Sequence, residues 1–495
     1  MKKFSIKELA QIIKARIETK TSYERSLPRA ESMGATSNDS FTNVSIDSRT
    51  TQAGECFFAI PGENFDGHDY VCDAFAKGAV CVVVSKDISS CVVRDASFYK
   101  NTQYAIRNTQ YVILRVDDTV KALGDFASEY RRQCGFKVVA ITGSVGKTMT
   151  RQIAYHVLNQ HFRVFQSPQN FNNQIGLPLT LLGADPEHQI VIAELGTNHP
   201  GEIAYLTHIA QPDIAVITNV YPAHLEGFGS LQAVAKEKLS IAEGLLKDGV
   251  FIINADLVKW LNGNRLNYQL PITNYQIKTF GKSDNSDYNA RNIICDGSVS
   301  TFIIADQDVC LPIPGPGNVE NAVAAWAVCS QFGLTIDDFA RAVKTLQTLA
   351  MRAELLQIGT LTVLNDCYNA NPASMNNALD ILTNLEPARK RRLVFICGDM
   401  AELGQQAESL HVELGVYIAQ AKVGVLLAVG KFAKVAAEAA KKAADYNLQT
   451  ICFDDTLSAC NNLREFIKDY DIILVKGSRA AKLELIVDKL KEYYS

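Results

Sequence analysis

The segment KVVAITGSVGKTMTR, residues 137–151, constrains the fold of this chain more than any other stretch. Its β-branched start predicts a buried strand, which runs directly into the glycine-rich sequence GSVGKT. Gly143 and Gly146 would let backbone N–H groups turn toward a bound phosphate. Lys147 would reach the terminal phosphates of a nucleotide, and Thr148 would offer its hydroxyl to Mg²⁺. The segment therefore predicts a nucleotide site at a strand-to-helix turn.

The loop is shorter than the usual phosphate loop. That pattern has a glycine five residues before the glycine of GK[ST], and here Ile141 stands at that position. What remains is GxxGKT, with Ser144 and Val145 inside the loop and Thr142 before it. A plain strand-to-helix turn is the alternative interpretation. The strand before the loop and the helix after it favour the phosphate loop.

Length and composition narrow the class of protein. At 495 residues the chain exceeds the limit of roughly 250–300 residues for one hydrophobic core, so we expect several domains. The formal net charge of −4, without a block of like charges, argues against a nucleic-acid partner. The first residues lack the apolar core of a signal peptide, and no segment approaches the roughly 18 apolar residues of a membrane span. Twelve cysteines without a CxxC pair indicate thiols in a reducing cytosol.

The order of the apolar runs divides the chain into three regions, residues 1–115, 116–347 and 348–495. The first is typical of a small α/β unit, with an amphipathic helix over 6–17 and polar surface segments at 22–40 and 86–110. The second alternates strands and helices, which predicts a doubly wound parallel sheet, with a small antiparallel appendage between 275 and 312. The third resumes the alternation and predicts a Rossmann-like domain. The expected fold class is α/β with three domains.

Two polar residues of the central region follow strands at their carboxyl ends, where parallel sheets bind ligands. Glu194 ends IVIAE, and His224 lies in ITNVYPAHLEG. A carboxylate beside a phosphate loop is well placed to hold Mg²⁺, which prefers oxygen ligands. A structural role for either residue is the alternative, because a lone Glu or His is more often structural.

Lys238 is the most informative single residue. It lies on the apolar stripe of its helix, seven residues from Leu231, whereas Lys236 projects roughly 140° away from Leu231. We therefore expect Lys238 to point inward and Lys236 to be solvated. Burial lowers the pKa of a lysine, and a neutral amine reacts with CO₂ to give a carbamate, which is an oxygen ligand for a metal. The alternatives are a lysine that snorkels to the surface or pairs with Glu226 or Glu243.

Further polar residues lie at helix starts and strand ends. Asn318 and Asn321 are one turn apart at the start of a helix, where they can meet a ligand such as adenine or cap the helix. Arg352 in MRAEL can stabilise the charge of a transferring phosphate. Asp366, at the end of LTVLND, can accept a hydrogen bond from a ribose hydroxyl, and VKGSR places Lys476 at a strand end.

Two polar clusters in the first region are candidates for a ligand pocket. The first comprises Ser45, Asp47, Ser48 and Arg49, and the second includes Asp66, Gly67 and His68. For Asp47 and Arg49, the residues alone favour an ordinary ion pair at a turn.

Several motifs occur in the order in which they are found in the Mur ligases. They are TGSVGKT, NFNNQIGLPLTLL, ELGTNHPGEIAYL, ITNVYPAHLEGFGSLQAVAKEK, PGNVENAVAA, MRAELL, NDCYNANPASM, GDMAELG and VKGSR. IDSR and FDGHDYV extend the similarity toward the start, so that it covers essentially the whole chain. The chain therefore resembles the Mur ligase family. YNANPASM, without the arginine-containing DNPR motif, separates it from the diaminopimelate-adding members.

This resemblance implies a ligand for each domain. The N-terminal domain would bind the UDP part of the substrate through the two polar clusters, and a loop with Asn170, Asn172 and Asn173 would contact substrate. The central domain would bind ATP through residues 143–148, with Asn318 and Asn321. Two magnesium ions would be held by Thr148, Glu194, His224 and a carbamylated Lys238. The C-terminal domain would bring Arg352, Asp366 and Lys476 to the nucleotide.

The resemblance also implies an activity. ATP would convert a carboxylate of UDP-N-acetylmuramoyl-tripeptide into an acyl phosphate, which the amine of D-alanyl-D-alanine displaces in peptidoglycan precursor synthesis. The expected catalytic residues are Lys147, His224, Lys238 and Arg352. We expect a cytoplasmic bacterial monomer. The alternatives are another Mur-type or folylpolyglutamate synthetase-like amide ligase, a phosphate-loop ATPase coupled to a partner, and a nucleotide-binding regulator.

Three positions depart from the pattern of the family. Met149 stands where a second Thr is common, Ser240 replaces a common Glu, and Gly317 replaces a usual His. None of them is an expected metal ligand, and Gly317 bears on how adenine is bound.

Overall fold

The computed structural model describes the chain except for residues 22–39, 89–109, 169, 262–274, 386–390 and 495. The polar segments predicted at 22–40 and 86–110 lie almost entirely outside the described residues. The chain forms two compact units. The first comprises Met1–Val138, Phe162–Ala193 and Tyr205–Gln211, and the second comprises Val139–His161, Glu194–Ala204 and Pro212–Ser495.

A five-stranded sheet forms the first part of the chain, in the order β2-β7-β6-β5-β4. Strand β2 runs antiparallel to β7, and the other neighbours are parallel. The strands are β2 (Arg16–Thr21), β4 (Val44–Ser45), β5 (Cys56–Phe58), β6 (Cys81–Val84) and β7 (Gln110–Arg115), and β1 (Phe4–Ser5) pairs separately with β3 (Ser40–Phe41). The helices are α1 (Ile6–Ile12), η1 (Gly67–Tyr70), α2 (Val71–Ala76) and α4 (Thr119–Cys134). Phe4, Phe41, Phe126 and Tyr130 pack together and join β1, β3 and α4.

The prediction of one helix over 6–17 is wrong. Helix α1 starts with a capping box at Ser5 but ends at Ile12. Lys14 adopts the left-handed conformation, with φ of 54°, and turns the chain into β2. Pairing of β2 with β7 then satisfies the backbone groups that a longer helix would have paired.

A seven-stranded sheet carries the phosphate-loop segment, in the order β14-β13-β12-β11-β8-β10-β9. Its strands are β8 (Lys137–Thr142), β9 (Val164–Gln166), β10 (Ile190–Glu194), β11 (Ile214–Ile217), β12 (Val250–Asn254), β13 (Gln276–Gly281) and β14 (Tyr288–Asn289). β10 and β9 are parallel, and so are the successive pairs β8–β11, β11–β12, β12–β13 and β13–β14. This confirms the predicted parallel α/β architecture.

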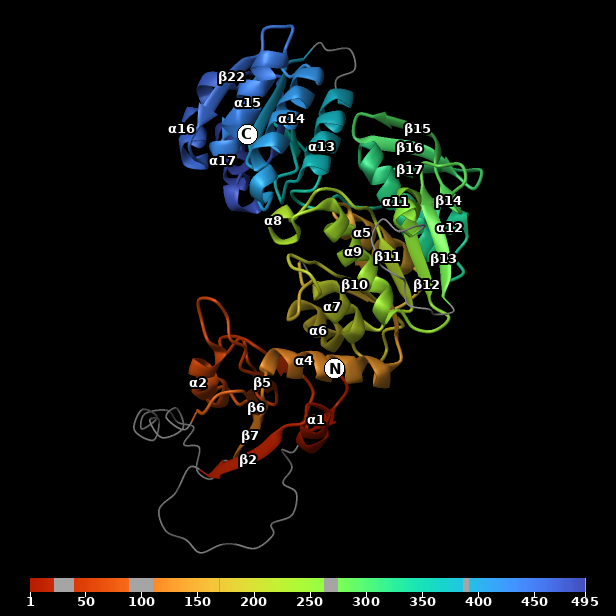
Figure 1. Ribbon diagram of the computed structural model, residues 1–495, viewed down its shortest axis with the longest axis vertical. Coiled ribbons are helices and arrows are strands. Elements are labelled where there is room, and N and C mark those ends of the chain that lie inside the picture. Colours follow the sequence, from red (N-terminus) through yellow and green to blue (C-terminus); the bar gives the residue numbers. More distant parts are fainter. Residues whose placement is uncertain (22–39, 89–109, 169, 262–274, 386–390, 495) are drawn as a thin grey trace, which may run out of the picture. The chain divides into compact units, whose positions relative to one another are not determined.

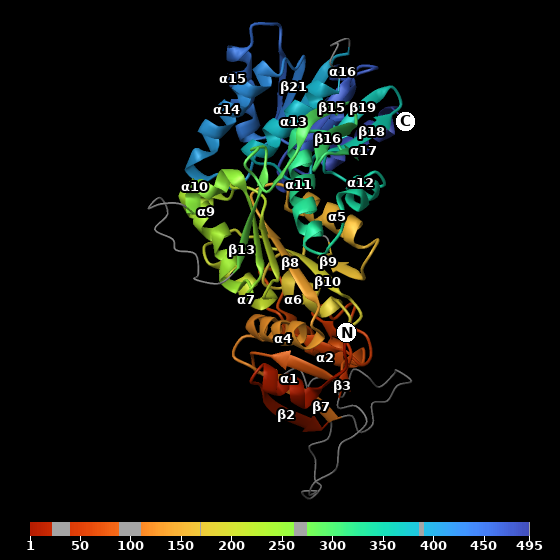
Figure 2. The same ribbon diagram turned by 90° about the vertical axis from the view of Figure 1, so that its right-hand side faces the viewer.

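Helices cover this sheet, as its continuous apolar strands require. They are α5 (Lys147–Leu158), α6 (Gly176–Gly183), α7 (Glu202–Ala210), α8 (Leu225–Phe228), α9 (Leu231–Leu239), η3 (Ser240–Gly244), η4 (Ala255–Leu257), α10 (Val258–Leu261), α11 (Pro316–Ser330) and α12 (Ile336–Val343). Figure 2 shows α5, α11 and α12 on one side of β13 and β8, with α9 on the other side.

The predicted appendage is present but begins later than expected. Strands β15 (Arg291–Asp296), β16 (Val299–Ile304) and β17 (Gln307–Leu311) form an antiparallel sheet. β13 and β14, which also lie within the range 275–312, join the parallel sheet instead. The reason is that β13 pairs with β12 over five residues, from Gln276 opposite Val250 to Phe280 opposite Asn254.

The last part of the chain is a second α/β layer structure with the strand order β18-β19-β23-β20-β21-β22. Only β18 is antiparallel to its neighbour in this sheet. The strands are β18 (Glu354–Ile358), β19 (Leu361–Asn365), β20 (Leu393–Gly398), β21 (Val425–Val429), β22 (Gln449–Phe453) and β23 (Ile472–Lys476). The helices are α13 (Pro372–Asn384), η5 (Gly404–Gln406), α14 (Ala407–Gln420), α15 (Lys431–Ala443), α16 (Thr456–Phe466), η6 (Arg479–Ala481) and α17 (Glu484–Tyr494). α16 and α17 pack on one face, and Figure 1 shows α13, α14 and α15 on the other.

Candidate active site

Strand β8 delivers the phosphate loop to helix α5. The strand continues through Thr142, so the loop begins only at Gly143. Gly143 and Gly146 have φ angles of 151° and 85°, which residues with side chains rarely adopt. A Cβ atom at Gly146 would lie 2.1 Å from Oδ1 of Asn321. Lys147, the first residue of α5, donates from Nζ to the carbonyl oxygen of Gly143 over 2.7 Å.

Residues just after strand β11 hold the first half of the loop. The N–H of Val145 donates to Oδ1 of Asn219 over 2.9 Å, and Nδ2 of Asn219 donates to the carbonyl oxygen of Val145 over 3.0 Å. Oγ1 of Thr218 donates to that carbonyl oxygen over 2.6 Å. The N–H of Ser144 donates to the carbonyl oxygen of Asn219 over 3.1 Å. The N–H groups of Ser144 and Val145 are thus engaged by Asn219. A phosphate would instead suit the N–H groups at the start of α5, because the first turn of a helix leaves them without intrahelical partners.

Thr148 and Glu194 meet beside the loop. Oγ1 of Thr148 donates to Oε2 of Glu194 over 2.8 Å, and both residues are buried. Nε of Arg151, one turn further along α5, lies 4.0 Å from the same carboxylate oxygen. Among the residues that the structure describes, no three or more His, Cys, Asp and Glu side chains group into a metal site. A hydroxyl and one carboxylate fit Mg²⁺, which keeps waters and phosphate oxygens as its other ligands.

Lys238 is buried in helix α9, as its place on the apolar stripe predicts. Its exposure is 2%, whereas Lys236 is exposed. This burial excludes a side chain that snorkels to the surface. Burial first, and then the charge of Lys147, lowers the pKa of Lys238 to about 7, and Glu237 opposes the shift. Near neutral pH the amine is therefore partly uncharged.

A group of cations surrounds the phosphate loop. Burial lowers the pKa of Lys147 and of Arg151, and the charge of Arg352 lowers both further. Glu194 opposes both shifts. Lys238 in turn experiences the charge of Lys147. Mutual repulsion within such a group is relieved when a polyanion such as a nucleotide triphosphate binds.

His224 lies just before helix α8 in the left-handed conformation, with φ of 53°. Its Nδ1 pairs with the carboxylate of Glu402, and the N–H of Glu226 donates to the carbonyl oxygen of Glu402 over 3.1 Å. The bond to His224 is the largest cause of the lowered pKa of Glu402. Because Nδ1 is engaged, Nε2 is the ring nitrogen that suits a metal.

Asn318 and Asn321 are both buried at the start of α11. Nδ2 of Asn318 donates to the carbonyl oxygen of Pro314 over 2.7 Å, and Nδ2 of Asn321 donates to Oδ1 of Asn318 over 3.3 Å. The N-cap residue of this helix is Gly315, and the N–H of Gly317 in its first turn donates to Oδ1 of Asn377 over 3.1 Å. The capping alternative for Asn318 is therefore wrong, and Asn321 packs against Gly146 of the loop. Adenine binding by the two residues stays a prediction.

Asp366 and Lys476 bind each other. Nζ of Lys476 donates to Oδ2 of Asp366 over 2.6 Å, and the N–H of Ala353 donates to Oδ1 of Asp366 over 3.0 Å. Lys476 is 2% exposed. The guanidinium of Arg352 lies 4.1 Å from the ring centroid of Tyr368. The pair thus orders the backbone beside Arg352, and its direct contact with ligand stays a prediction.

In the first unit, Asp47 and Arg49 form the ion pair that the residues alone predict. Nη2 of Arg49 lies 2.8 Å from Oδ2 of Asp47, and Nε lies 3.0 Å from Oδ1. Ser45 and Ser48 are buried, and Oγ of Ser45 donates to the carbonyl oxygen of Asp47 over 3.1 Å. Arg49 has 87% of its side chain exposed and Asp47 has 35%, so the guanidinium is the more accessible group of this ion pair.

The second cluster is held by a buried histidine. Nδ1 of His68 bonds to Oδ1 of Asp66 over 2.6 Å, and Nε2 accepts from the N–H of Ser85 over 2.9 Å. Lys86 pairs with the other oxygen of Asp66. A Cβ atom at Gly67 would lie 2.6 Å from the backbone nitrogen of Ile60, so only glycine fits there. Both ring nitrogens of His68 are engaged within the protein, which favours a positioning role over direct contact.

The asparagine loop precedes helix α6. Oδ1 of Asn173 accepts from the N–H groups of Ile175 and Gly176 over 3.2 and 2.8 Å. The N–H of Asn172 donates to the carbonyl oxygen of Asn170 over 2.8 Å. Asn173 therefore orders the start of the helix, and substrate contact by the loop stays a prediction.

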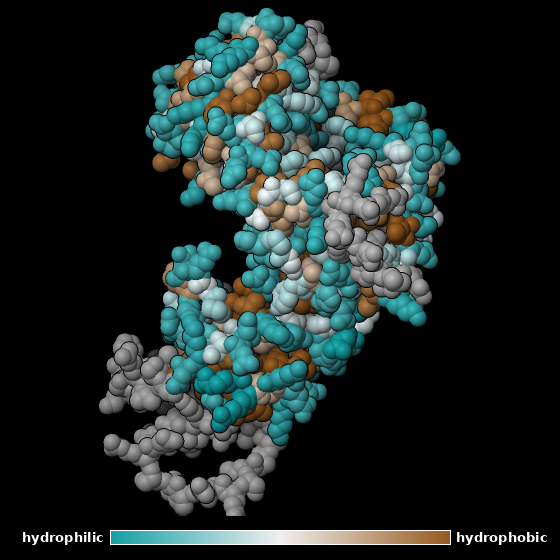
Figure 3. All heavy atoms as spheres, viewed as in Figure 1, coloured by the Kyte–Doolittle hydropathy of each residue, from teal (hydrophilic) through white to brown (hydrophobic). Residues whose placement is uncertain are grey.

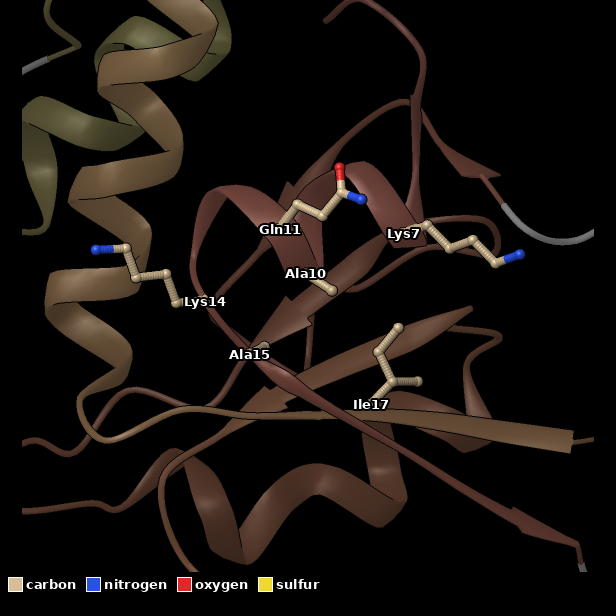
Figure 4. Close-up of a pocket in the computed structure, with 6 residues that line it drawn as sticks. All are labelled: Lys7, Ala10, Gln11, Lys14, Ala15 and Ile17. Atoms are coloured by element: carbon tan, nitrogen blue, oxygen red, sulfur yellow. The ribbon is translucent and has the colours of Figure 1, made fainter.

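One hollow of about 550 Å³ lies beside helix α1, and none of the candidate site residues lines it. Figure 4 shows its lining, which is Lys7, Ala10, Gln11, Lys14, Ala15 and Ile17. The amines of Lys7 and Lys14 point in different directions, so the hollow has no convergent polar groups and we assign it no role. On the face in Figure 3, hydrophobic residues form separate patches among hydrophilic ones. Within the described ranges, no helix is long and apolar enough to cross a membrane.

Three family models match consecutive parts of the chain. "Mur ligase family, catalytic domain" matches residues 40–131, "Mur ligase middle domain" matches 141–329, and "Mur ligase, glutamate ligase domain" matches 351–479. A UDP-N-acetylmuramoyl-tripeptide–D-alanyl-D-alanine ligase from Bacillus subtilis (strain 168) is 33% identical over 452 residues, 91% of this chain and 93% of that protein. The chain belongs to the Mur ligase family. The predicted family is confirmed.

Other members of the Mur ligase family are similar over nearly the whole chain. The ligase of the same name from Escherichia coli (strain K12) is 35% identical over 457 residues, 91% of this chain and 93% of that protein. The structure of MurF from Acinetobacter baumannii has a TM-score of 0.82 and 27% identity, and covers 99% of both chains. MurF from Thermotoga maritima, solved in complex with ADP, has a TM-score of 0.73 and 25% identity, over 91% of this chain and 97% of that one.

Several residues of this site were not predicted from the sequence. They are Arg151, Asn219, Glu237 and Glu402. Oε2 of Glu237 accepts from the N–H of Gly201 over 2.7 Å, and Oε1 accepts from the N–H of Ile203 over 2.7 Å. Helical spacing could have found Arg151, which is one turn from Lys147. The other three act on backbone groups or side chains that are distant in sequence, which no local pattern signals.

Proposed function

We propose that this Mur ligase joins D-alanyl-D-alanine to UDP-N-acetylmuramoyl-tripeptide with conversion of ATP to ADP and phosphate, in peptidoglycan precursor synthesis. One observation carries the proposal: the phosphate loop begins helix α5 beside the buried Thr148–Glu194 pair and a group of cations. The names of the two bacterial relatives and the ADP complex of the Thermotoga maritima protein support it.

The reaction has two steps. A carboxylate oxygen of the tripeptide attacks the γ-phosphorus of ATP, the bond from that phosphorus to the β–γ bridging oxygen breaks, and ADP leaves. The amine of D-alanyl-D-alanine then attacks the carbonyl carbon of the acyl phosphate, and phosphate leaves as the amide forms. The amine of Lys147 would leave the carbonyl oxygen of Gly143 and bind the phosphates of ATP instead. Arg352 would add positive charge beside these phosphates. Neither step needs a redox cofactor.

Magnesium fits the oxygen pair beside the loop. Thr148 and Glu194 would hold one ion, and His224 and a carbamylated Lys238 would contribute to the two-ion set. Magnesium would neutralise charge on the transferring phosphate. The carbamate would form when the neutral amine of Lys238 attacks CO₂ and loses a proton. The burial of Lys238, which lowers the pKa of its amine to about 7, supports this step.

We also propose that residues 1–115, 116–347 and 348–495 are the three functional domains. The first would bind the UDP part through Arg49 and the Asp66 turn, and the second would bind ATP. Separate sheets in these ranges support the division. The eleven described cysteines are free thiols, which supports a cytoplasmic location, and we propose a monomer.

Phosphate release tests the proposed function. The assay contains ATP, Mg²⁺, UDP-N-acetylmuramoyl-tripeptide and D-alanyl-D-alanine, and each component is omitted in turn. We expect release only with all four, and a product with the mass of the amide. Release that ignores both substrates would favour an uncoupled ATPase. Release that requires a different acceptor amine would favour another amide ligase of the family.

A further inference from the structure

We propose that Asn219 is a positioning residue for nucleotide binding, and that residues 218–221 act as a second half of the phosphate loop. The loop has Ile141 where a longer phosphate loop has its first glycine. Ile141 is fully buried in β8 and pairs with Val216 of β11. The residue therefore belongs to the sheet, and it takes no part in wrapping a phosphate.

The two chain segments stay side by side beyond the sheet. After Thr142 pairs with Ile217, the N–H of Thr218 donates to the carbonyl oxygen of Thr142 over 2.9 Å. The N–H of Ser144 then donates to the carbonyl oxygen of Asn219. A Cβ atom at Gly143 would lie 1.8 Å from Oγ1 of Thr218, so the glycine is required by this approach. The short loop is thus built against the neighbouring segment.

The amide of Asn219 acts on Val145 as a peptide group would. It accepts from the N–H of Val145 over 2.9 Å and donates to its carbonyl oxygen over 3.0 Å. The side-chain amide has the donor and the acceptor that these two groups need, and Oγ1 of Thr218 donates to the same carbonyl oxygen over 2.6 Å. Oγ of Ser144 makes a similar contact with Tyr221, accepting from its N–H over 3.0 Å and approaching its carbonyl oxygen at 3.0 Å.

These contacts order the loop before a nucleotide arrives. Ordering the backbone of a loop costs free energy, and a loop that is already ordered does not meet this cost on binding. Without the Asn219 amide, the backbone of Ser144 and Val145 would be ordered only when the nucleotide binds, and the cost of ordering it would weaken binding. The inference rests on the nucleotide site of the proposed function, and it adds a residue that acts on affinity through the loop.

The test compares Asn219→Ala with Asn159→Ala, an exposed asparagine at the other end of helix α5. Calorimetric titration with ADP and Mg²⁺ gives the dissociation constant of each variant. We expect Asn219→Ala to weaken ADP binding by about 10- to 100-fold and Asn159→Ala to leave it unchanged. In the ligase assay the KM for ATP should rise, and the KM values for the other two substrates should not.

Asn219→Asp and Thr218→Val provide independent readings if the alanine variant folds poorly. The aspartate lacks the donor to Val145 and should weaken ADP binding, and Thr218→Val removes one donor and keeps the volume. Hydrogen exchange of residues 143–148 should be faster in Asn219→Ala without ADP than in the wild type. The inference would be overturned if Asn219→Ala and Asn219→Asp bound ADP as tightly as the wild type. It would also be overturned if the KM values for ATP and for the other two substrates all rose in parallel in Asn219→Ala. A wild type that binds no ADP would overturn the proposed function as well.

Discussion

At the residue scale, the proposed magnesium site depends most on one buried lysine, Lys238, which we propose is carbamylated. Lys238 is 2% exposed with its pKa lowered to about 7, and Lys236 on the same helix is exposed. The two residues form a matched pair, because they are both lysines of helix α9 but differ in burial. A function that depends on a desolvated amine should therefore be lost on substitution of Lys238 and kept on substitution of Lys236.

We predict that Lys238→Ala loses about 10²-fold or more in kcat, and that Lys236→Ala changes kcat little. A short carboxylate such as acetate or formate should restore part of the activity of Lys238→Ala, because it can occupy the place of the carbamate. Steady-state kinetics with and without the added acid measures both effects. Equal losses in the two variants would contradict the assignment of Lys238 as the inward, functional lysine.

Sequence reasoning succeeded for structural features that follow from a local pattern, such as the burial of one residue or the backbone conformation of a loop. Lys238 followed from helical periodicity, and the loop glycines followed from a motif with a known backbone requirement. Asn219 could not be found this way, because its partner Val145 lies 74 residues away in the chain. No local pattern indicated that the ring of His68, a predicted substrate-binding residue, is held by Asp66 and Ser85, and its contact with substrate stays a prediction. Partners brought together by the fold decide such roles.

At the scale of elements, helix α9 is tied to the segment that follows β10. The carboxylate of Glu237 is 5% exposed and accepts from the N–H groups of Gly201 and Ile203, and the hydroxyl of Thr197 lies 3.3 Å away. The neighbouring residue on α9 is Lys238. One carboxylate thus links the helix that carries the lysine to the chain that leaves Glu194.

We predict that Glu237→Gln lowers the thermal midpoint, since one acceptor is lost and a buried N–H is left unsatisfied at about 1–3 kcal/mol. The expected kinetic effect is a reduced kcat with little change in the KM for D-alanyl-D-alanine. Glu413→Gln, an exposed position on α14, is the control. A midpoint and kcat for Glu237→Gln that match those of the control would contradict this link.

At the scale of the molecule, one contact joins segments 178 residues apart in the second unit. His224 pairs with Glu402, and the backbone of Glu226 binds the carbonyl oxygen of Glu402. A Cβ atom at Gly404, φ 54°, would lie 3.1 Å from Cα of Glu226, so the turn after Glu402 also fits closely. This contact connects a proposed metal ligand with the last α/β sheet.

The pH dependence of this contact follows from the lowered pKa of Glu402. A carboxylate with a lowered pKa stabilises the fold above its unfolded pKa, and the gain is lost as the pH falls through its folded pKa. We predict that Glu402→Gln lowers the thermal midpoint near pH 7, and that this difference disappears as the pH falls through the lowered folded pKa of Glu402. The effect should be small, about 1 kcal/mol or less, because the side chain is half exposed. A difference from wild type that grows toward acid pH would contradict this account.

The sequence predicted the parallel α/β architecture better than it predicted where individual helices and sheets begin and end. Apolar runs predicted the parallel strands because such strands are buried on both faces. They failed at the end of α1, where Lys14 turns the chain, and at β13, which pairs with β12 rather than with the antiparallel appendage. In both cases a long-range strand pairing decided the outcome.

The central claim is that ATP activates a carboxylate. The most direct test uses UDP-N-acetylmuramoyl-tripeptide labelled with ¹⁸O in the carboxylate that receives D-alanyl-D-alanine. Attack on the γ-phosphorus followed by amide formation must transfer one carboxylate oxygen to the released phosphate. Mass spectrometry of that phosphate should therefore detect ¹⁸O in proportion to the label, with none gained from H₂¹⁸O. Phosphate that takes its new oxygen from water would contradict the account.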